Sequence, residues 1–250
     1  MSKNKRIMVT GHLGYIGSVL TRRLKALRYP VVGYDIKEGK DITKIKVSDF
    51  KGVGVVVHLA AIASNPAGEV DKAETYRVNY FGSLRVGKLA KQAGVKTFVF
   101  FSGLSIYGNS ETTYSKSKFL AESDLMRLSD KNFQVVVLRP GVVFGASPNM
   151  RYDTVINQFV VTNEIIVKGD GSTIVPVIHI EDLCDTVIVA LSTKSGFYNV
   201  KYSDYTVKQL ADIAKAVLPP KKGNTLFVPG WSVEEGMVDL SAYLKNNENN

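Results

Sequence analysis

The chain has 250 residues, of which 45% are hydrophobic and 22% charged, a composition that excludes disorder for most of its length. Its longest apolar stretches are far shorter than the ~20 residues of a membrane-spanning helix, so we expect no membrane segment. The formal net charge is +9, but no run of Lys and Arg exceeds two residues, which favours a solvated mixed surface over a nucleic-acid partner. A single cysteine and a basic start without an apolar signal region predict a cytoplasmic location.

Short apolar runs alternate with longer amphipathic segments over the first 140 residues. We expect strands at 7–10, 31–34, 53–59, 97–101 and 134–138, and helices at 15–27, 73–92 and 114–128. Continuously apolar strands between helices indicate a parallel sheet that is covered on both faces. Right-handed crossovers then give an α/β fold with a doubly wound parallel sheet of the Rossmann type.

The pattern changes after about Ser147, where the expected elements become shorter. They lie at 157–162, 165–167, 173–180, 182–191 and 207–217. We therefore predict a dinucleotide-binding Rossmann domain over 1–147 and a small C-terminal substrate-binding lobe over 148–250. Part of 173–192 is expected to return to the first domain. Cys184 lies on an apolar helix pattern and is expected in the core.

Three glycines with GxxGxxG spacing follow the first expected strand and open the first helix. Gly11 permits a tight turn, Gly14 lets backbone approach a diphosphate, and Gly17 lets the helix pack on the strand. The helix start offers unpaired N–H groups and a partial positive charge to the phosphates. The spacing alone is common, and a structural glycine turn without a ligand is the alternative.

Asp35 ends the second expected strand, 18 residues after Gly17. A carboxylate there accepts hydrogen bonds from the two hydroxyls of an adenosine ribose and repels a 2′-phosphate, which favours NAD over NADP. Lys37 nearby weakens that repulsion. The alternative is a surface aspartate in a turn.

Tyr114 and Lys118 are four residues apart, so they share one face of the expected helix. An ammonium beside a phenol lowers the pKa of the phenol, which makes it a general acid or base near neutrality. One such pair is expected by chance in a chain of this composition. On its own it could equally be a solvated helix face.

The motifs occur in an order that is more specific than any one of them. After the glycine turn and Asp35 come Asp41-Ile42, His58-Leu59-Ala60-Ala61, Asn79, Ser102-Gly103-Leu104-Ser105-Ile106-Tyr107-Gly108, the Tyr114–Lys118 pair, Leu138-Arg139-Pro140 and His179-Ile180-Glu181-Asp182. Over residues 6–200 this resembles the extended short-chain dehydrogenases/reductases, and among them the NAD-dependent epimerase/dehydratase family typified by UDP-glucose 4-epimerase.

The resemblance implies a bound NAD along the carboxyl edge of the sheet. The pyrophosphate would lie on the turn from Gly11 through Gly14, Tyr15 and Ile16 to Gly17. The adenosine end would meet Asp35, Ile36, Asp41 and Ile42. Residues implied farther along the cofactor are Leu59, Ala60, Ala61, Asn79, Tyr114, Lys118 and Pro140, with Asn79 stabilising a sheet–helix junction and Pro140 beside the nicotinamide.

The resemblance also implies the chemistry. Tyr114 would take a hydroxyl proton while the carbon-bound hydrogen passes as hydride to NAD, giving a ketone. Lys118 would bind the nicotinamide ribose and depress the pKa of Tyr114. The helices at 76–91 and 114–128 resemble those of the family's four-helix dimer interface, which implies a homodimer.

Five positions depart from the family pattern. Gly103 replaces a Ser or Thr that binds the reacting oxygen, and Ser105 is our candidate substitute, because it faces the same side of an extended segment. Ser105 could instead bond only to backbone. Leu104 and Ser105 replace the acid pair of dehydratases, so we expect no dehydration. Val142 and Val175 replace an expected asparagine and a diphosphate-binding arginine.

We therefore expect an NAD-dependent epimerase-like oxidoreductase acting on a sugar nucleotide or related sugar through a transient keto intermediate. One alternative is a ketone reductase or alcohol dehydrogenase of the same fold. Another is a non-enzymatic NAD-binding regulatory protein, which Gly103 and Val175 motivate and the Tyr114–Lys118 pair opposes. The three histidines have no metal-ligand spacing, so no metal site is expected.

Overall fold

The computed structural model describes residues 6–63, 65–107, 111–162, 165–167, 169–201 and 203–218, together with Met237, Leu240 and Ser241. The chain divides into two compact units. The first comprises Met1–Pro140 and Cys184–Asn199, and the second comprises Gly141–Leu183 and Val200–Asn250. The division expected from the sequence, at 147 and 148, stays a prediction about the domains.

The first unit is built on a six-stranded sheet with the strand order β2-β1-β3-β4-β5-β8. Its strands are β1 (Arg6–Thr10), β2 (Val31–Tyr34), β3 (Val53–His58), β4 (Thr97–Phe101), β5 (Gln134–Pro140) and β8 (Gly196–Val200). The pairs from β2 to β5 are parallel. The chain leaves β1 toward β2 and later continues on its other side at β3, so the predicted doubly wound Rossmann-type sheet is confirmed.

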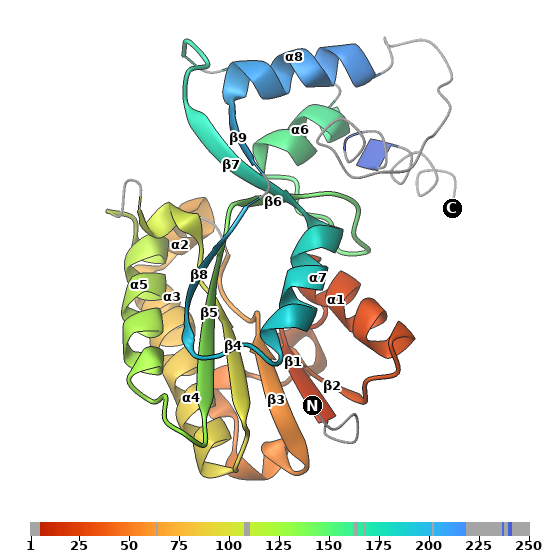
Figure 1. The fold of residues 1–250 in the computed structure, drawn as a ribbon. Coiled ribbons are helices and arrows are strands. Elements are labelled where there is room, and N and C mark those ends of the chain that lie inside the picture. The colour runs from red at the N-terminus through yellow and green to blue at the C-terminus, as the bar shows by residue number, and fades with distance from the viewer. Residues whose placement is uncertain are drawn as a thin grey trace. The chain divides into compact units, whose positions relative to one another are not determined.

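Helices cover both faces of this sheet (Figure 1), with α1 on one face and α3, α4 and α5 on the other. They are α1 (Tyr15–Ala26), α2 (Asn65–Val70), α3 (Lys72–Tyr76), α4 (Ser83–Gln92) and α5 (Thr113–Met126). The single helix expected at 73–92 is interrupted by a π-helical turn over Arg77–Gly82. Such turns insert one extra residue per turn and occur often at functional sites.

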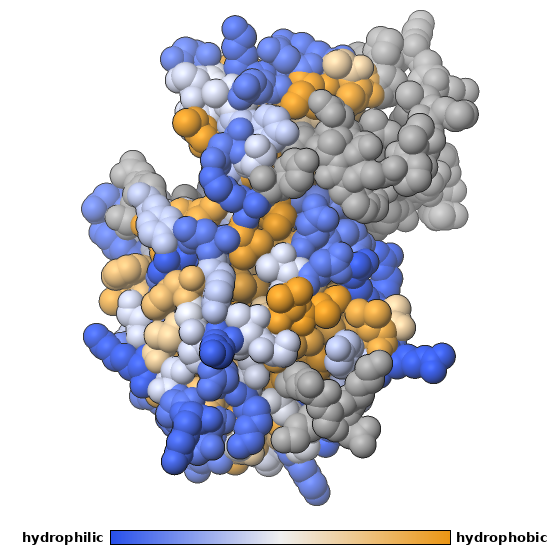
Figure 2. Space-filling model, viewed as in Figure 1, coloured by the Kyte–Doolittle hydropathy of each residue, from blue (hydrophilic) through white to orange (hydrophobic). Residues whose placement is uncertain are grey.

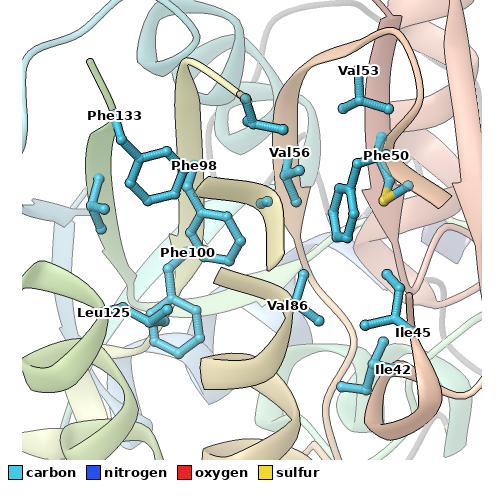
Figure 3. Packing of buried hydrophobic residues seen from close by; sticks show 14 of the residues in the cluster. Ile42, Ile45, Phe50, Val53, Val56, Val86, Phe98, Phe100, Leu125 and Phe133 are labelled. Atoms are coloured by element: carbon cyan, nitrogen blue, oxygen red, sulfur yellow. The ribbon is translucent and has the colours of Figure 1, made fainter. Parts of the chain in front are cut away.

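The main apolar core lies between the sheet and helices α4 and α5, which cover one of its faces. Side chains alternate along a strand, and the parallel register places Met8, Val56, Phe98 and Val135 in one row across four strands. Figure 3 shows the aromatic side chains of this core meeting Leu125 of α5 and Val86 of α4, among others. Each such buried side chain contributes roughly 1.5–3 kcal/mol, which fixes the strand ends that carry the site.

The second unit contains a three-stranded sheet with the order β6-β7-β9. Its strands are β6 (Val142–Phe144), β7 (Ile174–His179) and β9 (Ser203–Thr206), and its helices are α6 (Val155–Thr162) and α8 (Val207–Val217). Their apolar faces bury Phe144, Ile156, Phe159 and Leu210 together. Helix α7 (Ile180–Ala190) runs from this unit into the first, and Cys184 is buried on it, as predicted.

The surface mixes residue types, as Figure 2 shows for one face, where hydrophilic and hydrophobic residues are interspersed. No helix in the described part of the chain combines the length and the apolar character needed to cross a bilayer.

Candidate active site

The turn between β1 and α1 leaves no room for side chains at its glycines. Gly11 has φ +71°, and a Cβ atom on it would lie 2.8 Å from the backbone N of Ala60. A Cβ atom on Gly17 would collide with the carbonyl oxygen of Gly11. Gly14 precedes α1 and, being glycine, offers no capping side chain. The start of α1 therefore presents backbone N–H groups and the positive end of the helix dipole to an anion.

Asp35 lies directly beside this turn. Its carboxylate is buried and accepts hydrogen bonds from the N–H groups of Leu13, over 2.9 Å, and Lys37, over 3.0 Å. The Lys37 ammonium donates to the carbonyl oxygen of Leu13 over 3.2 Å. The glycine turn and the end of β2 are thus joined through one carboxylate, in the arrangement that ribose recognition needs.

Asp41 and Ile42 both contact other residues of the protein. The Asp41 carboxylate accepts from the N–H and the hydroxyl of Thr43, each over 2.8 Å, and lies 3.7 Å from the guanidinium of Arg77. Ile42 is buried in the main core, against Gly82. In this structure, Asp41 therefore caps a 3-10 turn, and its predicted contact with adenine stays a prediction.

His58 fixes the segment that follows β3. Its ring lies 2.7 Å from the Thr10 hydroxyl and 2.8 Å from the Ser83 hydroxyl, and the Thr10 hydroxyl accepts from the N–H of Ala60. Burial, and secondarily the charge of Lys118, lowers the pKa of His58 to about 3. His58 is therefore neutral at physiological pH and holds Leu59, Ala60 and Ala61 against the glycine turn.

Asn79 lies in the π-helical turn and joins three parts of the site. Its side chain accepts from the N–H of Ile62 over 2.8 Å and donates to the carbonyl of Ile62 over 3.0 Å. It also lies 3.4 Å from the Ser117 hydroxyl, which donates to the carbonyl of Tyr114. Asn79 thus links the segment after β3 to α5, and its predicted place along the cofactor stays a prediction.

Tyr114 begins the first turn of α5, and Lys118 lies one turn later on the same face. The Lys118 side chain is buried, donates to the carbonyl of Phe101 over 2.7 Å, and lies 4.7 Å above the ring of Phe100. Burial lowers the pKa of Lys118 to about 7, while Glu122 opposes that shift. The pKa of this amine therefore lies far below that of an exposed lysine, as is frequent at functional sites.

Helix α2 holds the start of α5, a relationship that the sequence analysis missed. Glu69 accepts from the N–H of Thr113 over 2.6 Å, and a Cβ atom on Gly68 would lie 3.1 Å from the Cβ of Tyr114. The Thr75 hydroxyl donates to the carbonyl of Gly68. The 44 residues between Glu69 and Thr113 leave no local signal for this cap.

The segment after β4 carries the predicted substitution. Gly103 has φ −174°, an extended conformation open to any residue, but Leu104–Ile106 forms a 3-10 turn, so the extended segment expected at Ser105 is wrong. A Cβ atom on Gly103 would lie 3.4 Å from the Ser105 hydroxyl and 3.9 Å from the carbonyl of Pro140, with no closer described neighbour. Ser105 is exposed, whereas the Ser102 hydroxyl is buried without a hydrogen-bond partner among the described residues. Gly108 lies outside the described residues.

The sequence-predicted residues fall into three contacting groups. The glycine turn meets Asp35 and Ala60; Asn79 is joined to the helix of Tyr114 and Lys118; and Gly103 is grouped with Ser105 and Pro140. Glu122 and Arg139 form a buried ion pair beside the second group. The sequence analysis did not single out this pair. The four-residue spacing of Lys118 and Glu122 on one helix could have indicated that Glu122 lies near the site.

Metal ligands do not gather at the site: among the described residues no three of His, Cys, Asp and Glu lie where they could hold an ion. His179 belongs to the second unit, where burial lowers its pKa to about 4.

Curated relatives are about a quarter to a third identical to this chain over the aligned residues. Human sterol-4-alpha-carboxylate 3-dehydrogenase, decarboxylating, is 28% identical over 216 residues, which cover 74% of this chain and 57% of the relative. Vibrio cholerae UDP-glucose 4-epimerase is 32% identical over 174 residues, covering 56% of this chain and 52% of the relative. The chain thus spans between half and two thirds of the length of these relatives.

Solved structures share the fold over nearly the whole chain. UDP-glucose 4-epimerase from Thermotoga maritima, solved with UDP-glucose, has a TM-score of 0.84 at 22% identity, covering 97% of this chain and 99% of that one. The Thermus thermophilus UDP-glucose 4-epimerase complex with NAD has a TM-score of 0.76 at 22% identity, covering 96% and 99%. The NAD dependent epimerase/dehydratase family model matches residues 7–200, and the chain belongs to that family, as the order of its motifs predicts.

Proposed function

We propose that the protein is an NAD-dependent epimerase-like oxidoreductase that acts on a sugar nucleotide or related sugar through a transient keto intermediate. The observation that carries the proposal is the buried amine of Lys118, hydrogen-bonded to Phe101 one helical turn from Tyr114. In its ammonium form, Lys118 would stabilise the phenolate form of Tyr114, which lies one turn earlier on the same helix face. That arrangement is expected of an acid–base pair and is costly for a purely structural lysine.

The first unit fits NAD. The glycine positions leave a side-chain-free cradle at the start of α1, and Asp35 is already held beside it. We assign the pyrophosphate to the turn of Gly11, Gly14, Tyr15, Ile16 and Gly17, and the adenosine end to Asp35, Ile36, Asp41 and Ile42. Leu59, Ala60, Ala61, Asn79 and Pro140 would line the path toward Tyr114. Solved relatives with NAD bound support this assignment.

Tyr114 would carry the proton chemistry. As a phenolate it takes the proton of the substrate hydroxyl, and as a phenol it returns the proton to the ketone oxygen. Lys118, when charged, keeps the pKa of that phenol near the working pH. Bound NAD supplies a reversible two-electron acceptor, and the chain supplies position and electrostatics.

Ser105 would bind the reacting oxygen. Its hydroxyl lies beside the space that a side chain at position 103 would occupy, so it can donate from the same region. With Leu104 and Ser105 in place of an acid pair, the segment offers no carboxylate to eliminate water, and we propose no dehydratase activity.

The substrate class rests on the relatives. Solved neighbours hold UDP-glucose or UDP-glucuronic acid, and we assign a sugar nucleotide or related sugar to this chain. The second unit, which we assign to substrate binding, has Val175 on β7 where the family's arginine is expected, so a diphosphate would be held by other groups.

A net oxidation is the second candidate. The 28% identity to a sterol dehydrogenase favours it, because that relative is named for a dehydrogenation. Absorbance at the reduced-nicotinamide band separates the two: an epimerase accumulates no NADH with its substrate, whereas a dehydrogenase or ketone reductase changes the NADH level stoichiometrically. A purely regulatory NAD-binding protein would show neither turnover.

We also propose a homodimer and a cytoplasmic location. Helices α4 and α5, with the π-helical turn, would supply the interface, and Phe81, Phe119 and Leu120 there are 61%, 53% and 42% exposed. A second copy covering these side chains would bury them. The single buried cysteine suits a reducing compartment.

The test is a turnover assay on Tyr114→Phe with a panel of UDP-sugars, and product isomers resolved by NMR. We expect the wild type to interconvert at least one pair of epimers, and Tyr114→Phe to lose more than about a hundredfold in kcat while NAD binding stays largely intact. Tyr29→Phe, beyond the far end of α1, is the matched control and should keep full turnover. Full activity in Tyr114→Phe would refute the assignment.

A further inference from the structure

A buried ion pair lies one helical turn beyond Lys118. The Glu122 carboxylate accepts from two nitrogens of Arg139, Nε over 3.1 Å and Nη2, so the guanidinium binds it through both oxygens. The exposed fractions of the two side chains are 1% and 13%. Such a pair is electrostatically strong, because little water screens it.

Glu122 is aligned with the proposed catalytic pair. Tyr114, Lys118 and Glu122 are spaced four residues apart in α5 and so lie along one face of the helix. Arg139 reaches this face from β5, the neighbour in the sheet of β4, whose Phe101 carbonyl accepts from Lys118. The ion pair therefore lies one helical turn from Lys118, and its carboxylate acts on the charge of the buried amine.

Burial is the main cause of the low pKa of Lys118, and the Glu122 carboxylate opposes it. His58, from β3, is neutral because its pKa is about 3, and the π-helical turn contributes the neutral amide of Asn79. Helix α2 contributes Glu69, whose carboxylate is engaged at the first N–H of α5. The segment after β4 contributes the phenol of Tyr107, which is hydrogen-bonded to Arg139.

We propose that Glu122 and Arg139 are positioning residues that set the protonation of Lys118, acting on it with opposite signs. The Glu122 carboxylate favours the ammonium form of Lys118. Arg139 binds both oxygens of that carboxylate and so limits the pull with which Glu122 opposes the effect of burial. The consequence for Tyr114 rests on the proposed function, whereas the effect on Lys118 does not.

Two aromatic rings hold the guanidinium of Arg139, so its positive charge has a fixed position in the site. Its guanidinium lies 5.0 Å from the ring centroid of Tyr107 and 4.6 Å from that of Phe197. Both rings offer the cation–π contact that suits a planar guanidinium. Tyr107 also lies two residues after Ser105, so the same arginine anchors the segment of the proposed hydroxyl donor.

The test is a direct titration of Lys118 in the full chain without substrate or NAD. Protein with lysine labelled at 13Cε is titrated by NMR, and the Lys118 signal is the one absent from Lys118→Met. We expect Glu122→Gln to lower the pKa of Lys118 by about one pH unit and Arg139→Gln to raise it by a similar amount. Shifts in the same direction, or none in either variant, would overturn the proposal.

Two further variants separate charge from structure. Arg139→Lys keeps the charge but loses the two-pronged geometry, and it should leave the pKa of Lys118 near the wild-type value. Glu122→Gln combined with Arg139→Gln removes both charges without stranding either, so it folds where a single variant fails, and its pKa should lie between those of the single variants. If the pKa of Lys118 in the double variant lies outside that interval, Glu122 and Arg139 do not act on it with opposite signs. The titration measures no turnover, so its result holds even if the proposed function is wrong.

Discussion

The Ser105 hydroxyl lies 3.4 Å from the point that a Cβ atom on Gly103 would occupy. The next described neighbour of that point is the carbonyl of Pro140, at 3.9 Å, and the φ of Gly103 is −174°. Neither backbone strain nor crowding therefore demands glycine at 103. Position 103 carries no side chain, and the Ser105 hydroxyl lies beside the space that a side chain there would occupy.

Moving the hydroxyl tests this substitution. We expect Ser105→Ala to lower kcat about a hundredfold, because the reacting oxygen loses a hydrogen-bond donor, and Gly103→Ser in that background to restore most of the loss. Steady-state kinetics on the substrate found in the panel assay measures both. If Ser105→Ala keeps full turnover, Ser105 bonds only to protein.

Cofactor choice depends on Asp35. Replacing it with serine removes a carboxylate that would bind the ribose hydroxyls, and a lost hydrogen bond to a charged group costs about 1.5–3 kcal/mol. Calorimetric titration should show NAD binding weakened roughly 10- to 100-fold and NADP binding weakened less or improved. Asp170→Asn, on an exposed turn of the second unit, is the control and should bind NAD as the wild type does. Unchanged NAD affinity in Asp35→Ser would place the cofactor elsewhere.

Burying Lys118 costs stability. Its pKa falls from 10.5 to about 7 on folding, so the native state disfavours the proton that the unfolded chain binds, and stability is lost as pH falls from about 10.5 to 7. We expect Lys118→Met to raise the free energy of unfolding at pH 7 by about 1–3 kcal/mol, after allowing for the lost bond to Phe101. Urea unfolding at pH 7 measures it. A less stable Lys118→Met would mean that the amine is well accommodated.

Acid should weaken the fold through His58. Its pKa is about 3 in the native state against 6.5 as its ordinary value, so stability present above pH 6.5 is lost as pH falls toward 3. The expected slope is about 1.4 kcal/mol per pH unit below pH 6. His58→Gln should be less stable at pH 7, because two hydrogen bonds change, yet lose less between pH 7 and 5. If the stability of the wild type and of His58→Gln falls equally with pH, His58 is not the cause of the acid sensitivity.

The sequence pattern predicted the fold well, because each short apolar run or helical spacing can be recognised within a single segment of the chain. The strand at 97–101 and the helix at 207–217 match the structure, because the first is a short continuous apolar run and the second has apolar residues at helical spacing. The π-helical turn at Arg77–Gly82 was missed, because its extra residue per turn follows from packing against α5 and the segment after β3.

The candidate site was predicted where residues are close in sequence. The glycine turn and the Tyr114–Lys118 pair are local, and Asp35 follows from the strand that carries it. Glu69 at the start of α5 was not predictable, because that contact joins residues 44 apart. The partner of Glu122 was also hidden, since the sheet order that brings β5 beside β4 is a tertiary property.

A crystal structure of the protein with NAD tests the central claim most directly. We expect the diphosphate on the N–H groups from Gly11 to Gly17, the adenosine ribose on Asp35, and the amine of Lys118 and the phenol of Tyr114 within about 3 Å of the nicotinamide ribose. An empty glycine turn at saturating NAD, or a dinucleotide whose nicotinamide end points away from Tyr114, would contradict it.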